Sequence, residues 1–159
     1  LSKSCLRRTF LFLHMQKNFV DQTGRKVSLT QYPKRIISLV PSLTDILHHL
    51  ELENETIGIT KFCVHPARWL KEKIIIGGTK NPDIYRILSL LPDLILANKE
   101  ENNKEHVEQL SNHFPIWVSD IIRVNDQEEL IQQLGEITNR ENQAKDLNEK
   151  INLAYQSIL

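Results

Sequence analysis

Short apolar runs alternate with amphipathic stretches along most of this chain. The runs are rich in Ile, Leu and Val, which is typical of strands whose two faces are both buried. They lie at residues 35–40, 56–60, 73–76, 93–97 and 115–118. Between them, apolar residues recur at helical spacing, as they do on the buried face of a helix. The alternation predicts an α/β fold in which a mostly parallel, Rossmann-like sheet is flanked by helices.

A different pattern stands at each end of this alternation. Residues 19–29 predict a small β-hairpin, in which Gly24 supplies the positive φ of a tight turn. The last stretch, residues 141–159, predicts one long amphipathic helix. The apolar stripe of that helix consists of Leu147, Ile151, Tyr155 and Ile158.

Polar residues mark the expected starts of three helices. Ser42 and Asp45 have the spacing of a capping box. Asn81 is a good N-cap because proline follows it at the first helical position. Either Asn125 or Asp126 is expected to cap the helix that follows the last strand.

Composition narrows the classes of function. The 159 residues hold 20 Lys+Arg and 20 Asp+Glu, so the formal net charge is zero and the basic surface typical of nucleic-acid binding is absent. A hydrophobic fraction of 40% is enough for one buried core.

No apolar run approaches the roughly 18 residues of a membrane-spanning helix, so direct membrane insertion is not expected. Two cysteines, Cys5 and Cys63, exclude a disulfide-rich scaffold, and we expect Cys63 to be a free thiol.

Residues 1–17 are interpreted as a poorly structured or spurious extension. The chain begins with Leu1, and its single methionine is Met15. The apolar stretch after Arg7 and Arg8 is shorter than that of a signal peptide, and no small-residue cleavage site follows it. A cytoplasmic location would follow if Met15 were the true start.

The carboxyl ends of parallel strands meet at one edge of a sheet, and ligands of such sheets bind there. The loops expected at that edge include residues 41–42, 61–66, 77–81 and 98–102. The two lysines among our candidates would favour anionic groups of a ligand, and the phenylalanine would offer apolar contact. The candidate ligand-binding residues are Ser42, Phe62, Cys63, His65, Gly78, Thr79, Lys80 and Lys99.

Two features of these loops invite a more chemical interpretation. Cys63 and His65 are two positions apart, so they would face the same side of an extended loop and could supply sulfur and nitrogen ligands to a metal. No third ligand is nearby, and we predict neither a metal site nor catalytic residues. Residues 77–80 lie between a strand and a helix, where free amides could capture an anion, but they match no phosphate-binding motif and a tight turn explains them.

Four motifs occur in a specific order along the chain. The first is Asp21-x-x-Gly-Arg-x-Val27, and the others are residues 33–39, 41–45 and 91–97. Together they resemble the substrate-binding proteins of ABC importers for cobalamin and ferric siderophores, over roughly residues 18–159. The resemblance implies an N-terminal α/β lobe at 18–140 and the start of an interdomain helix at 141–159. It also implies that the second lobe of these two-lobed proteins is missing.

The resemblance implies a function as well. It implies binding of a metal chelate such as a ferric siderophore, haem or cobalamin, without catalysis or a cofactor. The implied partners are the membrane subunits of an ABC importer, and the implied location is the periplasm or cell envelope. Where the family often carries a glutamate that docks onto importer arginines, this chain has Tyr85 followed by Arg86. Where the cobalamin binders place an aromatic residue, it has Thr79, which weighs against cobalamin.

Two other functions stay open on the residues alone. One is a Rossmann-like enzyme that uses Cys63 or His65 at the same sheet edge. The other is a cytoplasmic interaction module built from a single lobe.

Overall fold

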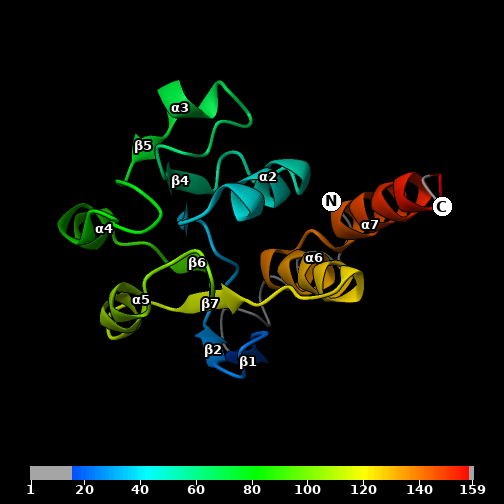
Figure 1. Ribbon diagram of the computed structural model, residues 1–159. Helices are drawn as coiled ribbons and strands as arrows, with labels where there is room; N and C mark the ends of the chain where they lie inside the picture. The colour runs from blue at the N-terminus through cyan, green and yellow to red at the C-terminus, as the bar shows by residue number, and fades with distance from the viewer. Residues whose placement is uncertain (1–15, 158–159) are drawn as a thin grey trace, which may run out of the picture.

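A parallel five-stranded sheet forms the centre of the computed structural model, which describes residues 16–157 (Figure 1). The strand order is β5-β4-β3-β6-β7, and every neighbouring pair is parallel. The predicted α/β class is therefore confirmed, with a sheet that is parallel throughout. The strands are β3 (Ile36–Ser38), β4 (Thr56–Ile59), β5 (Ile74–Ile75), β6 (Leu94–Asn98) and β7 (Ile116–Ser119).

Helices cover both faces of this sheet (Figure 1). Successive residues of β6 point to opposite faces: Leu94 and Leu96 belong to one apolar core and Ile95 to the other. The first core includes residues of α2, α6 and α7, and the second includes residues of α4 and α5. Within residues 16–157, every helix is too short or too polar to span a lipid bilayer. The helices are α2 (Pro41–His49), α3 (Trp69–Glu72), α4 (Ile84–Leu90), α5 (Lys104–Ser111), α6 (Val124–Thr138) and α7 (Glu141–Gln156).

The predicted cap of α2 is wrong. The N-cap is Val40, which makes no side-chain capping bond, and Pro41 occupies the first helical position. Proline is pre-organised for that position and needs no partner for an N–H group. Ser42 therefore lies one residue inside the helix, with an exposed side chain.

The predicted caps of α4 and α6 are also wrong. Asp83, not Asn81, caps α4, and its carboxylate accepts from the backbone N–H of Arg86. Pro82 instead pairs with Gly77 across a tight turn, which delays the start of the helix. The N-cap of α6 is Arg123, two or three residues earlier than predicted.

A β-hairpin precedes the sheet, as predicted. Its strands are β1 (Lys17–Val20) and β2 (Lys26–Leu29), and Gly24 has a φ of +83° in the turn. Lys17 thus belongs to a strand, inside the stretch predicted to be unstructured. The rest of that prediction, for residues 1–15, lies outside the described part of the chain.

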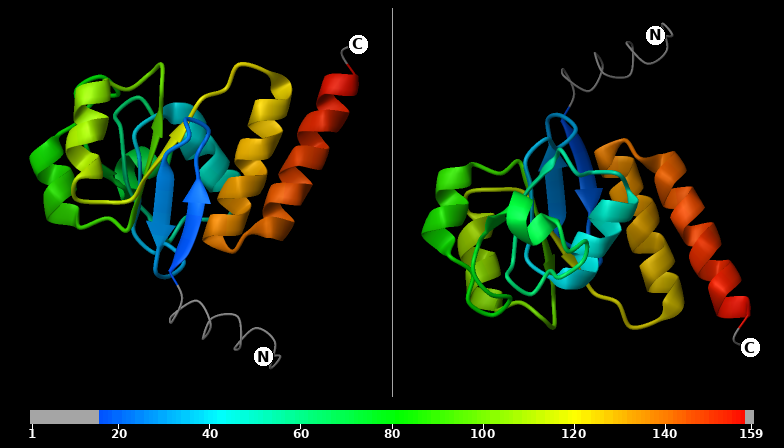
Figure 2. Two further views of the ribbon diagram at one scale, coloured as in Figure 1. Left: turned by 90° about the horizontal axis from the view of Figure 1, so that it is seen from below. Right: turned by 90° about the horizontal axis from the view of Figure 1, so that it is seen from above.

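The hairpin turn protects the outer edge of β7 (Figure 2). The carboxylate of Asp21 accepts from the backbone N–H of Val118 at 2.9 Å. The side-chain oxygen of Gln22 accepts from the backbone N–H of Asp120 at 3.1 Å. These side chains satisfy amides that an edge strand would otherwise leave open to another strand.

Helices α6 and α7 pack very closely against each other. A Cβ atom built on Gly135 would lie 2.5 Å from the Cβ of Ala144. The long C-terminal helix is confirmed, although Tyr155 of its predicted apolar stripe is 47% exposed and Ile158 lies outside the described residues. The last described turn of α7 lies at the same end of the molecule as the loop between β7 and α6 (Figure 2).

Candidate functional site

The loops after the five strands form one edge of the sheet, which we call the rim. It comprises residues 39–40 with the first two residues of α2, and residues 60–68, 76–83, 99–103 and 120–123. Backbone bonds join neighbouring loops: the Lys61 N–H donates to the Gly77 carbonyl at 3.0 Å, and the Lys99 N–H donates to the Ser119 carbonyl at 2.9 Å. The convergence of the loops that the sequence predicted is therefore present.

A buried asparagine organises the middle of the rim. Asn102 is 6% exposed, and its amide nitrogen donates to the carbonyl of Leu39 at 3.3 Å and to that of Thr79 at 2.9 Å. Its amide oxygen accepts from the backbone N–H of Asn98 at 2.8 Å. One side chain thus fixes three loops. Sequence reasoning missed it because two of its partners are distant along the chain, so no local pattern marks it.

One flank of the rim gathers several predicted residues from the loops after β4 and β5. Phe62 is 53% exposed, and a Cβ on Gly78 would lie 3.4 Å from the Phe62 ring. The Lys61 ammonium lies 5.2 Å from the centre of the same ring. Lys80 is exposed and donates to the carbonyl of Glu100 at 2.8 Å, while Thr79 is half-buried. An apolar ring therefore lies beside cationic groups on an accessible surface.

Cys63 does not line this surface. Its side chain is fully buried and its sulfur lies 3.0 Å from the Thr44 hydroxyl and 3.2 Å from the Thr60 hydroxyl. The loop turns here, because the Cys63 N–H donates to the Thr60 carbonyl. His65 is exposed, so the expectation that the two side chains face the same side is wrong. Cys63 is a free thiol, as predicted.

Metal-ligating side chains do not gather within residues 16–157: no group of three or more His, Cys, Asp or Glu is placed to hold an ion. The rim instead offers hydrogen-bonding, cationic and apolar groups. Such a surface is suited to binding a small molecule.

Lys99 lies on the other flank of the rim, beside the hairpin. Its ammonium donates to the Asp120 carboxylate at 2.6 Å, and this bond raises the pKa of Lys99 above its usual value of 10.5. The adjoining loop exposes Ile121 (39%) and Ile122 (79%), which sequence reasoning did not select. Lys99 and Phe62 therefore belong to different loops and have different neighbours.

The predicted docking residues lie in the first turn of α4. Tyr85 is 86% exposed. Arg86 is held in place, because its guanidinium donates to the Ile75 carbonyl at 2.8 Å and lies 3.6 Å from the Asp83 carboxylate. Tyr85 is the freer of the two for contact with another protein.

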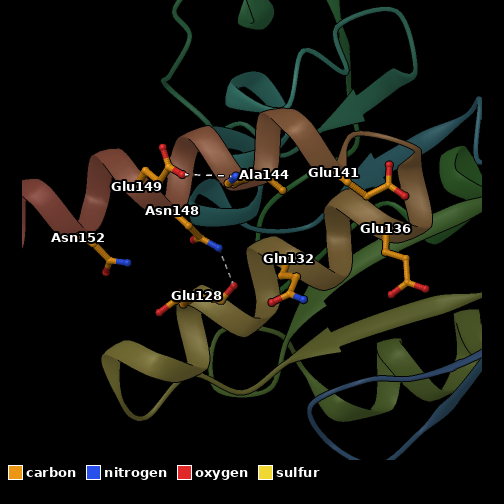
Figure 3. Close-up of a pocket in the computed structure, with 9 residues that line it drawn as sticks. Glu128, Gln132, Glu136, Glu141, Ala144, Asn148, Glu149 and Asn152 are labelled. Carbon is orange, nitrogen blue, oxygen red and sulfur yellow. Dashed lines mark hydrogen bonds and ion pairs between the residues drawn. The ribbon is translucent and has the colours of Figure 1, made fainter.

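A polar groove of about 600 Å³ lies away from the predicted residues, between α6 and α7 (Figure 3). Asn148 on α7 donates to the backbone carbonyl of Glu128 on α6 at 3.0 Å across it. Lys145 and Glu149 form an exposed ion pair along α7. The groove is lined mainly by glutamate and amide side chains and contains none of the candidate ligand-binding residues.

Comparison with known proteins identifies the family. A vitamin B12-binding protein of Pectobacterium carotovorum is 30% identical over 114 residues, which are 71% of this chain and 41% of the relative. An uncharacterized ABC transporter substrate-binding lipoprotein of Bacillus subtilis, YvrC, is 35% identical over 80 residues, which are 50% of this chain and 24% of the relative. The chain thus spans less than half the length of these relatives.

A solved structure shares the fold. The siderophore-binding protein BauB, bound to ferric iron and acinetobactin, superposes with a TM-score of 0.81 at 21% identity, over 91% of this chain and 53% of that one. The sequence model of the periplasmic binding protein family matches residues 36–158, from the first strand of the sheet into the last helix. The chain belongs to the periplasmic binding protein family.

Proposed function

We propose that this chain is the N-terminal lobe of the substrate-binding component of an ABC importer for a metal chelate, such as a ferric siderophore, haem or cobalamin. The observation that carries the proposal is the rim, where the Asn102 amide ties loops together beneath an exposed mixture of apolar and cationic groups. The relatives support it, since one is a vitamin B12-binding protein and another an ABC transporter substrate-binding lipoprotein.

The proposed ligand wall is the rim flank around Phe62. The Phe62 ring supplies apolar contact, and Lys61 and Lys80 favour ligands with anionic groups. Thr79 stands beside them and offers a hydroxyl instead of an aromatic ring. We exclude Cys63 from the proposed ligand-binding residues because its side chain is buried. The wall consists of Ser42, Phe62, His65, Gly78, Thr79 and Lys80, with Lys99 at its far flank.

A second wall completes the cleft in this proposal. Residues 18–140 form the first lobe and residues 141–159 begin the helix that leads to the second. Two observations support this division: the chain spans 41% of the length of the B12-binding relative, and α7 runs toward the rim end of the molecule.

The proposed partners are the membrane subunits of the importer, and the proposed location is the periplasm or cell envelope. Tyr85 and Arg86 are the proposed docking residues on this lobe. Tyr85 has the exposure that such a contact needs. Because Tyr85 is uncharged, Tyr85→Glu would add the charge that the family uses, with a gain in association of about 1 kcal/mol or less for a solvated pair.

The proposed function is binding without chemistry. An enzyme built on Cys63 would need an accessible thiolate, whereas this sulfur is buried among hydroxyl groups. That observation weighs against the form of the Rossmann-like enzyme that would use Cys63, whereas His65 is exposed. No comparable feature favours an interaction module.

The affinity of the isolated lobe tests the proposal. A cleft buries about 70–90% of its ligand, and one wall supplies roughly half of the contacts. If a two-lobed protein bound at about 1 μM, or −8.2 kcal/mol, half of that free energy would leave millimolar binding. We therefore predict that this chain binds no chelate more tightly than about 100 μM. Calorimetry with cobalamin, haem, a ferric catecholate and a ferric hydroxamate measures this, and micromolar binding by the monomer would contradict it.

Amide chemical shifts locate the weak contact. We expect the chelate that binds to shift the amides of residues 61–65 and 78–80. Lys80→Ala should weaken an anionic chelate about fivefold to tenfold, since one charge-assisted contact is lost. Lys71→Ala is the matched control, because Lys71 is exposed on α3 outside the proposed wall. Shifts confined to residues 125–157 would exclude the rim as the binding site.

A further inference from the structure

A second pocket lies beside the rim, between the hairpin turn and α5. Its volume is about 350 Å³, within the range of small-ligand sites. Thr23 and Arg25 of the hairpin form one wall, and Lys104 and Glu108 of α5 form the opposite wall. Lys99 of the rim also lines the pocket, as does Val118 of β7. The lining residues therefore come from the hairpin, from residues 98–108 and from β7.

Positive charge predominates among the side chains that line this pocket. The lining carries three cations, Arg25, Lys99 and Lys104, against one carboxylate, Glu108. Two carboxylates outside the lining contact residues of the lining: Asp120 pairs with Lys99, and Asp21 accepts from the backbone N–H groups of Thr23 and Arg25. The Asp21 carboxylate also accepts a hydrogen bond from the backbone N–H of Val118.

The cations keep unused donors in spite of these pairs. A guanidinium has five N–H donors and an ammonium has three. Arg25 gives a side-chain donor to Glu108, and Lys99 gives one to Asp120. Lys104 has no ion-pair partner among residues 16–157. An oxygen-rich anion could therefore be held by all three groups without breaking either ion pair.

We propose that this pocket binds a small oxyanion of phosphate size, at a site that shares Lys99 with the far flank of the proposed chelate wall and contains none of its other residues. A phosphate has several acceptor oxygens and a charge that suits convergent Arg and Lys donors. The Arg25–Glu108 ion pair spans the pocket from the hairpin to α5. Occupancy by an anion would add a further link between these two elements.

Titration with inorganic phosphate at constant ionic strength tests the site in the full chain. We expect saturable amide shifts at residues 23–25 and 98–104, and a rise in the unfolding temperature. Lys104→Ala should weaken phosphate binding about tenfold, by loss of one charge-assisted hydrogen bond. Glu108→Gln should strengthen it, because the lining loses its carboxylate. Lys150→Ala, an exposed lysine on α7, is the control and should change nothing.

The responses of these variants distinguish binding at a specific site from nonspecific screening of surface charges by phosphate. Equal responses of Lys104→Ala and Lys150→Ala, or shifts spread over all exposed lysines, would overturn the proposal. So would the absence of saturation up to millimolar phosphate. Acetate and citrate in parallel distinguish a phosphate site from one for carboxylates. A preference for phosphate or for acetate supports a site for a small oxyanion, whereas a preference for citrate, or equal and non-saturating responses to all three anions, contradicts it.

Discussion

At the scale of single residues, Leu91 holds an unusual backbone conformation at the end of α4. Its φ is +47° and its ψ is +59°, a left-handed conformation that costs a residue with a Cβ roughly 1–2 kcal/mol. The side chain is 69% exposed, so it contributes little to the core. Arg35 stabilises this helix end by donating to the carbonyls of Leu90 and Leu91.

We predict that Leu91→Gly stabilises the protein by about 0.5–1 kcal/mol, because glycine adopts this conformation without strain. The gain is smaller than the strain, since glycine also makes the unfolded chain more flexible. Urea unfolding measures the change. Ser89→Gly, an exposed helical position two residues earlier, should destabilise the protein. Destabilisation by both variants would contradict the argument.

Asp126 links stability to pH. Its carboxylate accepts from the backbone N–H groups of Ile122 and Arg123, and these two bonds lower the pKa of Asp126 below its usual value of 3.8. A carboxylate with a lowered pKa stabilises the folded state above its unfolded pKa. That stabilisation is lost as the pH falls through the folded value.

Asp126→Asn should therefore destabilise the protein at pH 7, and the difference from the original protein should shrink as the pH falls below 3.8. Urea midpoints measured from pH 7 to pH 3 test this. Asp146→Asn, on an exposed part of α7, serves as the control. A difference that stayed constant over this pH range would contradict the assigned role of the carboxylate.

At the scale of elements, the strands and the start of α7 could be predicted from sequence, whereas the starts of α2, α4 and α6 could not. An apolar run such as Leu94, Ile95 and Leu96 needs two buried faces, and the structure supplies two cores. The start of α4 depends instead on the turn in which Pro82 pairs with Gly77. Gly77 lies in that turn with a φ of +95°. The general preference of asparagine for helix caps carries no information about such a turn.

The rim also has features that the sequence could predict and features that it could not. Its convergence follows from parallel strand order, which the alternating pattern predicts. The directions of the Cys63 and Lys99 side chains could not be predicted from that pattern. They depend on Thr44 and Asp120, which lie 19 and 21 residues away along the chain. The role of Asn102 was not predicted for the same reason, because its partners Leu39 and Thr79 are also distant along the chain.

The contact between α6 and α7 is set by two small residues. We predict that Gly135→Ala destabilises the protein by about 1–3 kcal/mol, because the new methyl group would overlap Ala144. The higher helix propensity of alanine offsets up to about 1 kcal/mol of this cost. Chemical denaturation gives the change in the free energy of unfolding.

A reciprocal exchange provides the control for this contact. Ala144→Gly in the Gly135→Ala background moves the methyl group to the other helix and should recover part of the lost stability. The two substitutions should therefore show a favourable coupling in a double-mutant cycle. Additive losses would mean that the overlap is relieved by movement of α7 alone.

At the scale of the whole molecule, Asp21 connects the hairpin to the sheet. It is 5% exposed, and its two oxygens accept from the amides of Thr23, Arg25 and Val118. Asp21→Ala should destabilise the protein by roughly 2–3 kcal/mol, because hydrogen bonds to a charged group are lost and the Val118 amide is left unpaired.

Denaturation and hydrogen exchange test this connection together. The exchange rate of the Val118 amide should rise in Asp21→Ala more than that of Ile95, in the middle of the sheet. Asp45→Ala, which removes an exposed carboxylate from α2, should change stability by less than about 0.5 kcal/mol. Equal effects of the two variants would rule out a special role for Asp21.

The hairpin also sets an order of events during synthesis. It leaves the ribosome before every strand of the central sheet, yet Asp21 and Gln22 bond to groups 97, 98 and 104 residues later. Contacts over such separations close long loops and form slowly. The hairpin therefore waits, undocked, until β7 and the start of α6 have been made. The part of the fold that is translated earliest is fixed in place only after most of the chain exists.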